Sequence, residues 1–458
     1  MADDLSPADR ASLAAERGPV NMTVGAALVF AGGPGLARDA IVARIGERLH
    51  LIPRYRQRLD EAPLGLANPV WVDDSTFDLP WHVRSATLPP PGGRTELADY
   101  VGREMSGRLD RRRPLWELHI VDGLEGGRVA LIPKMHHALV DGVAAIDIGT
   151  VLLDPTPEPM DVPPPDAPWV PETRDRSARL ARMAATPFLR AQKVALDGAM
   201  RALDTSPRSA AQDLRRATDL VTELARARPQ APMLPINRPI SPNRRFAMER
   251  IRLDEVKAAA KLGGGTVNDA LLAAVAGMLG RYLDPGPDDP APVALVPVSI
   301  RGEGEEGGNR ISTVFVDLPI HEADAVARIR LVAAATRELK GSAAVRAGAL
   351  MVGATGWAPP AVSSVLVRAM GGVRAFNVVV SNVPGPQQTF YLSGSPLLET
   401  YPIVPLNPAN QGLSVGILSY DGGVHFGLLA DRDLDPPLGD AAAALRAALA
   451  ELAELAAA

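Results

Sequence analysis

Two spacings of hydrophobic residues alternate through the first third of the chain. Apolar positions in RDAIVARIGERL, which begins at Arg38, recur at the spacing of a helix. The continuous apolar segments Asn21–Phe30 and Arg128–His137 predict strands, and Val143–Leu153 predicts another helix. Residues 1–153 are therefore expected to form one unit of mixed strands and helices.

Proline interrupts this pattern in the middle of the chain. Asp154–Glu172 has proline at nearly every second position, which excludes a helix or a central strand and predicts an extended linker. Arg174–Arg228 is arginine-rich with helical spacing, and a second proline cluster follows at Pro229–Pro242. We expect residues 154–243 to form a long crossover.

Residues 244–458 predict a second unit of strands and helices. Strands are expected at Val293–Ile300, Ser312–Ile320, Phe376–Pro386 and Gly412–Tyr420, and helices at Thr266–Leu283, Glu322–Lys340 and Gly439–Ala458. The segment Ile251–Leu262 leads through a glycine turn into the first of these helices. The chain as a whole predicts an α/β (α+β) fold of two domains.

Composition narrows the possible chemistry. The 458 residues carry a net charge of -5, so the surface as a whole is not that of a nucleic-acid-binding protein. The absence of cysteine excludes disulfides, thiolate nucleophiles and cysteine-ligated metal sites. The polar, acidic start is unlike a signal peptide, and no apolar run approaches the roughly 18 residues of a membrane span. We expect a cytoplasmic protein.

Two of the 7 histidines stand side by side in LIPKMHHALVDG. Neighbouring residues of a strand point to opposite faces, so His136 and His137 cannot chelate together; one can face a cavity while the other packs inward. Asp141-Gly142 then marks a tight turn. Three interpretations remain open: two structural histidines, a metal site without an obvious third ligand, or a general base that accepts a proton near neutral pH.

The motif His-His-x-x-x-Asp-Gly resembles the active-site motif of the CoA-dependent acyltransferase superfamily, which includes chloramphenicol acetyltransferase and peptide-synthetase condensation domains. The chain further resembles bacterial wax ester synthase/diacylglycerol acyltransferases along its length, in the family's order. The similar segments are its opening LSPADRASLAAERGPVNMTVG, Pro114-Leu115-Trp116, Asn268-Asp269, Val296–Arg301, Gly307–Ser312, Val380–Pro386 and Gly412–Asp431.

This resemblance implies two chloramphenicol-acetyltransferase-like domains with a catalytic tunnel at their interface. His137 would be the general base in direct acyl transfer from acyl-CoA, a co-substrate, to the hydroxyl of diacylglycerol or a fatty alcohol. No cofactor, metal or acyl-enzyme is implied. His136, Asp141 and Gly142 would support the base, with Arg301 bridging to Asp141.

Other motif residues keep two interpretations each. Thr266 and Asp269 predict a helix-capping box, and Asn268 either belongs only to that cap or hydrogen-bonds near the base. Ser381 either stabilises an oxyanion or lies in a plain turn. Trp116 is expected mainly as a core anchor. Ser414 matches Gly-x-Ser-x-Gly, but its flanks continue as strand, so a nucleophile elbow is rejected.

Two rival functions stay open: a condensation-type acyltransferase that uses carrier-bound donors, and an inactive lipid-binding member of the family. The basic, amphipathic segment Glu172–Lys193 either lies on an anionic membrane or lipid droplet, packs on the domains, or meets CoA phosphates.

Overall fold

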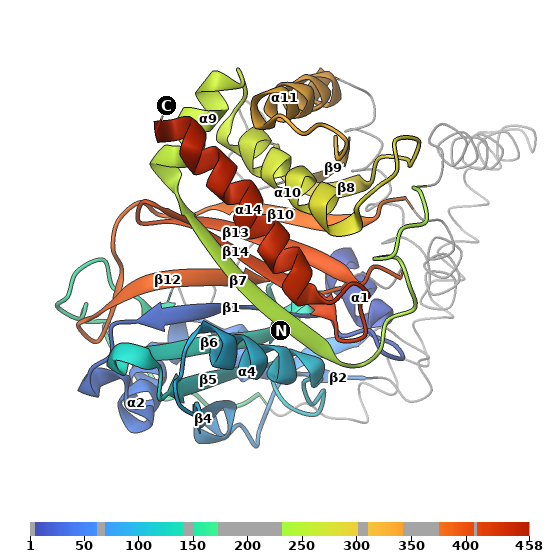
Figure 1. Cartoon of the computed structure of the whole chain (residues 1–458). Coiled ribbons are helices and arrows are strands. Elements are labelled where there is room, and N and C mark those ends of the chain that lie inside the picture. The colour runs from blue at the N-terminus through green and yellow to red at the C-terminus, as the bar shows by residue number, and fades with distance from the viewer. Residues whose placement is uncertain are drawn as a thin grey trace, which may run out of the picture.

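The computed structural model describes residues 5–61, 69–140, 151–172, 231–300, 310–341, 375–406 and 410–457. Within these ranges two six-stranded sheets lie one above the other (Figure 1). The first has the order β11-β12-β1-β6-β5-β4 and the second β7-β14-β13-β10-β8-β9. A two-stranded ribbon pairs β2 with β3.

The strands of the first sheet are β1 Thr23–Phe30, β4 Val83–Thr87, β5 Trp116–Asp122, β6 Val129–His136, β11 Tyr391–Leu392 and β12 Ser395–Ile403. Those of the second are β7 Arg244–Arg252, β8 Val293–Ile300, β9 Arg310–Asp317, β10 Val378–Pro384, β13 Leu413–Tyr420 and β14 Gly423–Asp431. The ribbon is β2 Gln57–Asp60 with β3 Val70–Asp73.

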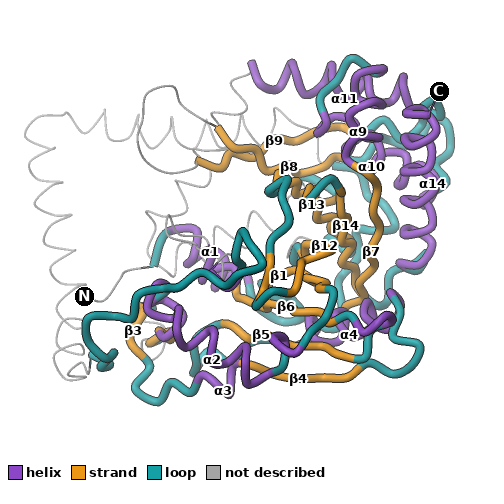
Figure 2. The backbone as a smooth tube through the Cα atoms, turned by 90° about the vertical axis from the view of Figure 1, so that its left-hand side faces the viewer, coloured by secondary structure: helices purple, strands orange, loops and turns teal. Residues whose placement is uncertain are grey.

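Helices pack on both sheets. With the first sheet lie α1 Pro7–Ala15, α2 Arg38–Arg48, α3 Leu79–His82, α4 Arg94–Ser106 and α5 His137–Val140. Of these, α4 lies on the face of the first sheet that is turned toward β7. On the second lie α9 Leu253–Leu262, α10 Val267–Leu283, α11 Ala325–Gly341 and α14 Leu438–Ala457, which form the layer at the top of Figure 1. Figure 2 shows the same layering from the side.

A strand from the C-terminal half completes the first sheet. β12 pairs antiparallel with β1, with Gly25 opposite Ile403 and Leu28 opposite Thr400. The second sheet then packs closely on β12, because a Cβ added at Gly427 would lie 2.0 Å from the carbonyl oxygen of Pro402. The two halves of the chain are therefore held together by a strand of the C-terminal half that joins the first sheet, as well as by side-chain packing.

The elements predicted from hydrophobic spacing are confirmed at the described positions. Residues 154–172 contain no helix or named strand, as their prolines predict. Most of the predicted helix at Val143–Leu153 and all of Arg174–Arg228 lie outside the described residues. β12 was not among the predicted strands. No single described helix has the length and composition to span a bilayer; α9 and α10 meet that test only as a pair, across a 92° bend.

Candidate active site

The histidine pair lies where β6 ends and α5 begins. The His136 N–H donates to the Leu115 carbonyl at 3.0 Å, and the His137 N–H donates to the Met22 carbonyl at 2.8 Å. His136 is buried, with 1% of its surface exposed, whereas His137 is half-buried. The prediction that the two histidines have different environments is confirmed.

His136 is fixed by its own backbone and by a buried carboxylate. Its Nδ1 accepts a hydrogen bond from the Ala138 N–H at 3.0 Å, which assigns the ring proton to Nε2. That Nε2 lies 3.6 Å from Oε2 of Glu16, too far for a normal hydrogen bond but close enough for electrostatic attraction. The orientation of the His136 ring is therefore set by the Ala138 N–H on one side and the Glu16 carboxylate on the other.

Glu16 is a site residue that sequence reasoning missed. Its Oε2 accepts two hydrogen bonds from Arg111, at 2.9 and 3.2 Å, and its Oε1 accepts one from the Met22 N–H at 3.3 Å. Burial alone would raise the pKa of Glu16, but His136 and Arg111 lower it to about 2. One anionic side chain thus orients His136 and the segment whose carbonyl anchors His137. In the sequence Glu16 stands in LAAERGPV, where no local pattern distinguishes it from a solvated glutamate.

His137 is placed by the N-terminal helix. Its Nδ1 lies 3.5 Å from the hydroxyl oxygen of Ser12 on α1, at the limit of a hydrogen bond. In the tautomer whose Nδ1–H donates to that hydroxyl, Nε2 is the ring nitrogen that carries the lone pair. The His137 ring thus lies half-buried between α1 and the end of β6, and its role as a base stays a prediction.

Pro114-Leu115-Trp116 supports the pair from the neighbouring strand. The Leu115 carbonyl receives the His136 N–H, and the indole of Trp116 is fully buried and donates to the Tyr55 carbonyl at 2.8 Å. The ring of His82 stacks on Trp116 at a centroid distance of 4.5 Å. The expectation that Trp116 is a core anchor is confirmed.

Asn268 and Asp269 are neighbours with different hydrogen-bond partners. Asp269 and Thr266 form the predicted capping box of α10, and Asp269 also accepts from the Thr336 hydroxyl at 2.8 Å. Asn268 is not part of this cap: its Oδ1 accepts a hydrogen bond from Asn382 Nδ2 at 3.0 Å. Asn268 therefore joins α10 to β10, and a hydrogen bond near the base stays a prediction.

The two candidate serines, Ser381 and Ser414, differ in burial. Ser381 is half-buried on β10, beside Asn382 and in register with Gly416 of β13. Its role toward an oxyanion stays a prediction. Ser414 is buried inside the continuous strand β13, and its hydroxyl donates to the Val404 carbonyl at 2.6 Å. The rejection of a nucleophile elbow at Ser414 is confirmed.

Asp141, Gly142 and Arg301 lie outside the described residues, so the proposed bridge between Asp141 and Arg301 stays a prediction. Across the described ranges no three or more histidine, aspartate or glutamate side chains gather as a candidate metal site.

Comparison with known proteins identifies the family. The wax ester synthase/diacylglycerol acyltransferase catalytic-domain model matches residues 5–271, and the C-terminal-domain model of the same family matches residues 307–453. The chain belongs to the wax ester synthase/diacylglycerol acyltransferase family. It is accordingly an acyltransferase, as the resemblance implied.

Relatives of this acyltransferase cover it along almost its whole length. A protein of Mycobacterium tuberculosis H37Rv assigned as a diacylglycerol O-acyltransferase is 34% identical over 98% of this chain and 99% of its own. One of Mycobacterium bovis with the same assignment is 32% identical over 98% of both chains.

Solved structures agree on the architecture. The wax ester synthase/diacylglycerol acyltransferase of Marinobacter aquaeolei VT8 superposes with a TM-score of 0.70 at 28% identity, and each chain is covered completely. The starter condensation domain of rhizomide synthetase superposes with a TM-score of 0.56 at 14% identity, over 100% of this chain and 95% of that one, which shows a shared fold. The predicted two-domain acyltransferase fold is confirmed.

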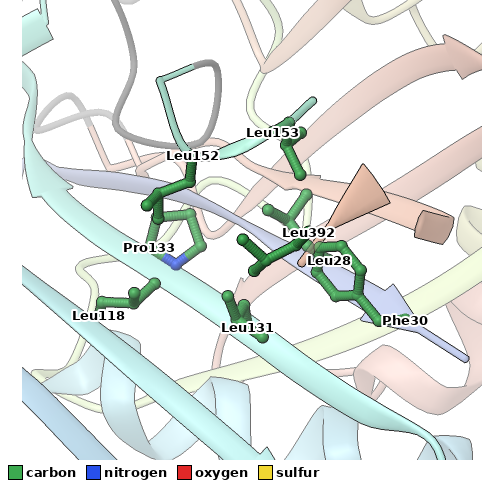
Figure 3. Close-up of a pocket in the computed structure, with 8 residues that line it drawn as sticks. All are labelled: Leu28, Phe30, Leu118, Leu131, Pro133, Leu152, Leu153 and Leu392. Atoms are coloured by element: carbon green, nitrogen blue, oxygen red, sulfur yellow. The ribbon is translucent and has the colours of Figure 1, made fainter. Parts of the chain in front are cut away.

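A small apolar crevice lies on the first sheet. Figure 3 shows its lining from β1, β5, β6, β11 and the segment at Leu152 and Leu153. Its volume is about 10 Å³, which is room for a single water molecule. The crevice is packed core, on the side of β6 that carries Leu131 and Pro133. The catalytic tunnel stays a prediction.

Proposed function

We propose that this protein transfers a long-chain acyl group from acyl-CoA directly to the hydroxyl of diacylglycerol or a long-chain alcohol. His137 removes the hydroxyl proton as the oxygen attacks the thioester carbonyl. The new carbon–oxygen bond forms, the carbon–sulfur bond breaks, and the histidine returns its proton to the departing CoA thiolate. General base catalysis contributes about 10²–10⁴-fold to such a step.

The placement of His137 is the observation that carries this proposal. The ring is half-buried at the end of β6, its backbone is held by Met22, and its neighbour His136 is occupied with Glu16. The two relatives assigned as diacylglycerol O-acyltransferases support a diacylglycerol acceptor. Family membership supports acyl-CoA as the donor.

The roles of the remaining motif residues belong to the same proposal. Arg301 bridges to Asp141 and holds the turn after the base, and Ser381 assists charge on the carbonyl oxygen. Orientation of both substrates in a dry channel supplies the rate enhancement that the base does not. We also propose that the protein works at the surface of a membrane or lipid droplet, where such acceptors reside.

The test offers purified protein radiolabelled palmitoyl-CoA with hexadecanol, monoacylglycerol or dioleoylglycerol in parallel. We expect labelled triacylglycerol or wax ester and one free CoA per ester. Labelled protein in the absence of acceptor would indicate an acyl-enzyme and contradict direct transfer. Binding of palmitoyl-CoA without turnover on any acceptor would favour a lipid-binding role.

A condensation-type reaction is the second candidate, because the fold also matches a condensation domain. A palmitoyl group on a carrier protein is the discriminating donor. Transfer from the carrier at a higher kcat/KM than from palmitoyl-CoA would favour that reaction.

A further inference from the structure

A second cavity, of about 300 Å³, lies between the two sheets and away from the histidines. Four segments surround it: the start of α4 with Arg94, the turn before β6 with Arg128, β7 with Arg250, and β12 with Glu399 and Tyr401. Arg128 and His136 are eight residues apart along an extended strand, which is roughly 25 Å. A ligand in this cavity therefore does not touch the histidine pair.

The carboxylate inside the cavity is already satisfied. Glu399 accepts a hydrogen bond from Arg250 at 2.7 Å and another from the Tyr401 hydroxyl at 2.8 Å. Burial raises the pKa of Tyr401, and the neighbouring Glu399 charge acts in the same direction, so the phenol stays a hydrogen-bond donor. Glu399 thus serves as an internal counter-ion for Arg250.

Two arginines keep capacity for a further anion. Arg128 donates Nε to the Glu125 carbonyl at 2.9 Å, and no ion pair with a carboxylate is formed by it among the described residues. Arg94 Nη1 donates to the Met248 carbonyl at 3.4 Å and lies 3.6 Å from Oε2 of Glu249, whose Oε1 is held by Arg446 at 2.6 Å. These contacts use one of the two terminal nitrogens of Arg94. Among the lining side chains, three arginines face two glutamates, which leaves one net positive charge.

We propose that this cavity binds a phosphorylated small molecule. Guanidinium groups that converge from three separate segments suit phosphate, whose oxygens accept hydrogen bonds in several directions, better than a planar carboxylate. The volume is at the lower end of small-molecule sites, so it accommodates a phosphate with a small polar substituent. Arg94 and Arg128 belong to the first-sheet unit and Arg250 to the second, so the ligand would bridge the two halves.

Inorganic pyrophosphate is the probe, measured by calorimetry and by thermal unfolding of the full chain at low chloride concentration. We expect saturable binding to one site and a rise in Tm with ligand concentration. Arg128→Gln and, separately, Arg94→Gln should each weaken binding about tenfold, because each removes a charged hydrogen-bond donor. Far-UV circular dichroism confirms that each variant is folded.

Arg432→Gln is the matched control, because it removes one arginine charge from a side chain that is 50% exposed and outside the cavity. Its affinity for pyrophosphate should equal that of the wild type. The absence of saturable binding, or an affinity unchanged in both Arg128→Gln and Arg94→Gln, would overturn the proposal.

Further arms identify the source of the phosphate. Glycerol 3-phosphate represents a lipid headgroup, and CoA is compared with 3′-dephospho-CoA, both in the His137→Ala background as well as in the wild type. A compound that binds more tightly than pyrophosphate, and whose affinity falls in Arg128→Gln, identifies the source of the phosphate. If no compound does so, the ligand is inorganic. Because binding is measured directly, this result is independent of whether acyl transfer occurs.

Discussion

Removing the charge of Glu16 tests how the histidine pair is held. Glu16→Gln keeps the shape of the side chain but takes away the anion that accepts two hydrogen bonds from Arg111 and attracts His136. The pKa of Glu16 is lowered from 4.5 to about 2, and at about 1.36 kcal/mol per unit this difference corresponds to roughly 3 kcal/mol of folding free energy.

The sign of the pH dependence follows from that lowered pKa. The stabilisation is fully present above the unfolded-state pKa near 4.5 and is lost as pH falls toward about 2. Urea unfolding from pH 7 down to pH 3 should therefore show a steeper loss of stability for the wild type than for Glu16→Gln. At pH 7 the variant should be less stable by about 2–3 kcal/mol.

Glu61→Gln is the matched control for this measurement. Glu61 pairs with the same Arg111 at 3.2 Å, but its side chain is 54% exposed, so its loss should change stability by less than about 1 kcal/mol. Equal effects of the two substitutions, or a Glu16→Gln protein with the wild-type pH dependence, would refute the assignment of Glu16 as the buried anchor.

Three further substitutions test the supporting structure. Thr266→Ala removes the cap of α10 and should lower the free energy of unfolding by about 1 kcal/mol in urea titrations; unchanged stability would contradict the capping role. Ser414→Ala should cost about 1 kcal/mol in the same titration while acyl transfer persists, and abolished transfer in a folded variant would reinstate a nucleophile there. Trp116→Ala should cost about 3–5 kcal/mol in thermal unfolding, because a fully buried indole leaves a cavity; a loss below 1 kcal/mol would show that the ring is not a core anchor.

Hydrophobic spacing predicted local structure well where each element carries its own signal. The helix at α2 and the strands at β6 and β13 follow directly from apolar periodicity. β12 was not predicted, because SPLLETYPI mixes proline, charge and apolar residues and its place beside β1 depends on a partner more than 360 residues earlier in the chain. Long-range pairing of this kind is not encoded in any local window.

The site was predictable to the extent that chemistry is local. The two adjacent histidines differ in burial as expected, but His137 begins α5 instead of continuing the predicted strand, so the change from strand to helix also sets its orientation. Glu16 could not be assigned, because its contact with His136 joins segments 120 residues apart and a lone glutamate after a helix is usually solvated. The contact between Ser12 and His137 was not predicted for the same reason, because it forms only where α1 packs on α5.

Acyl transfer by two alanine variants, each checked for folding, tests the central claim most directly. In assays with palmitoyl-CoA and the best acceptor, His137→Ala should lose nearly all turnover while it still binds the donor. His136→Ala should retain part of the wild-type kcat, because that ring orients its neighbourhood. Wild-type turnover by His137→Ala would contradict His137 as the base. An equal and complete loss in both variants would contradict the assignment of the two rings to different faces.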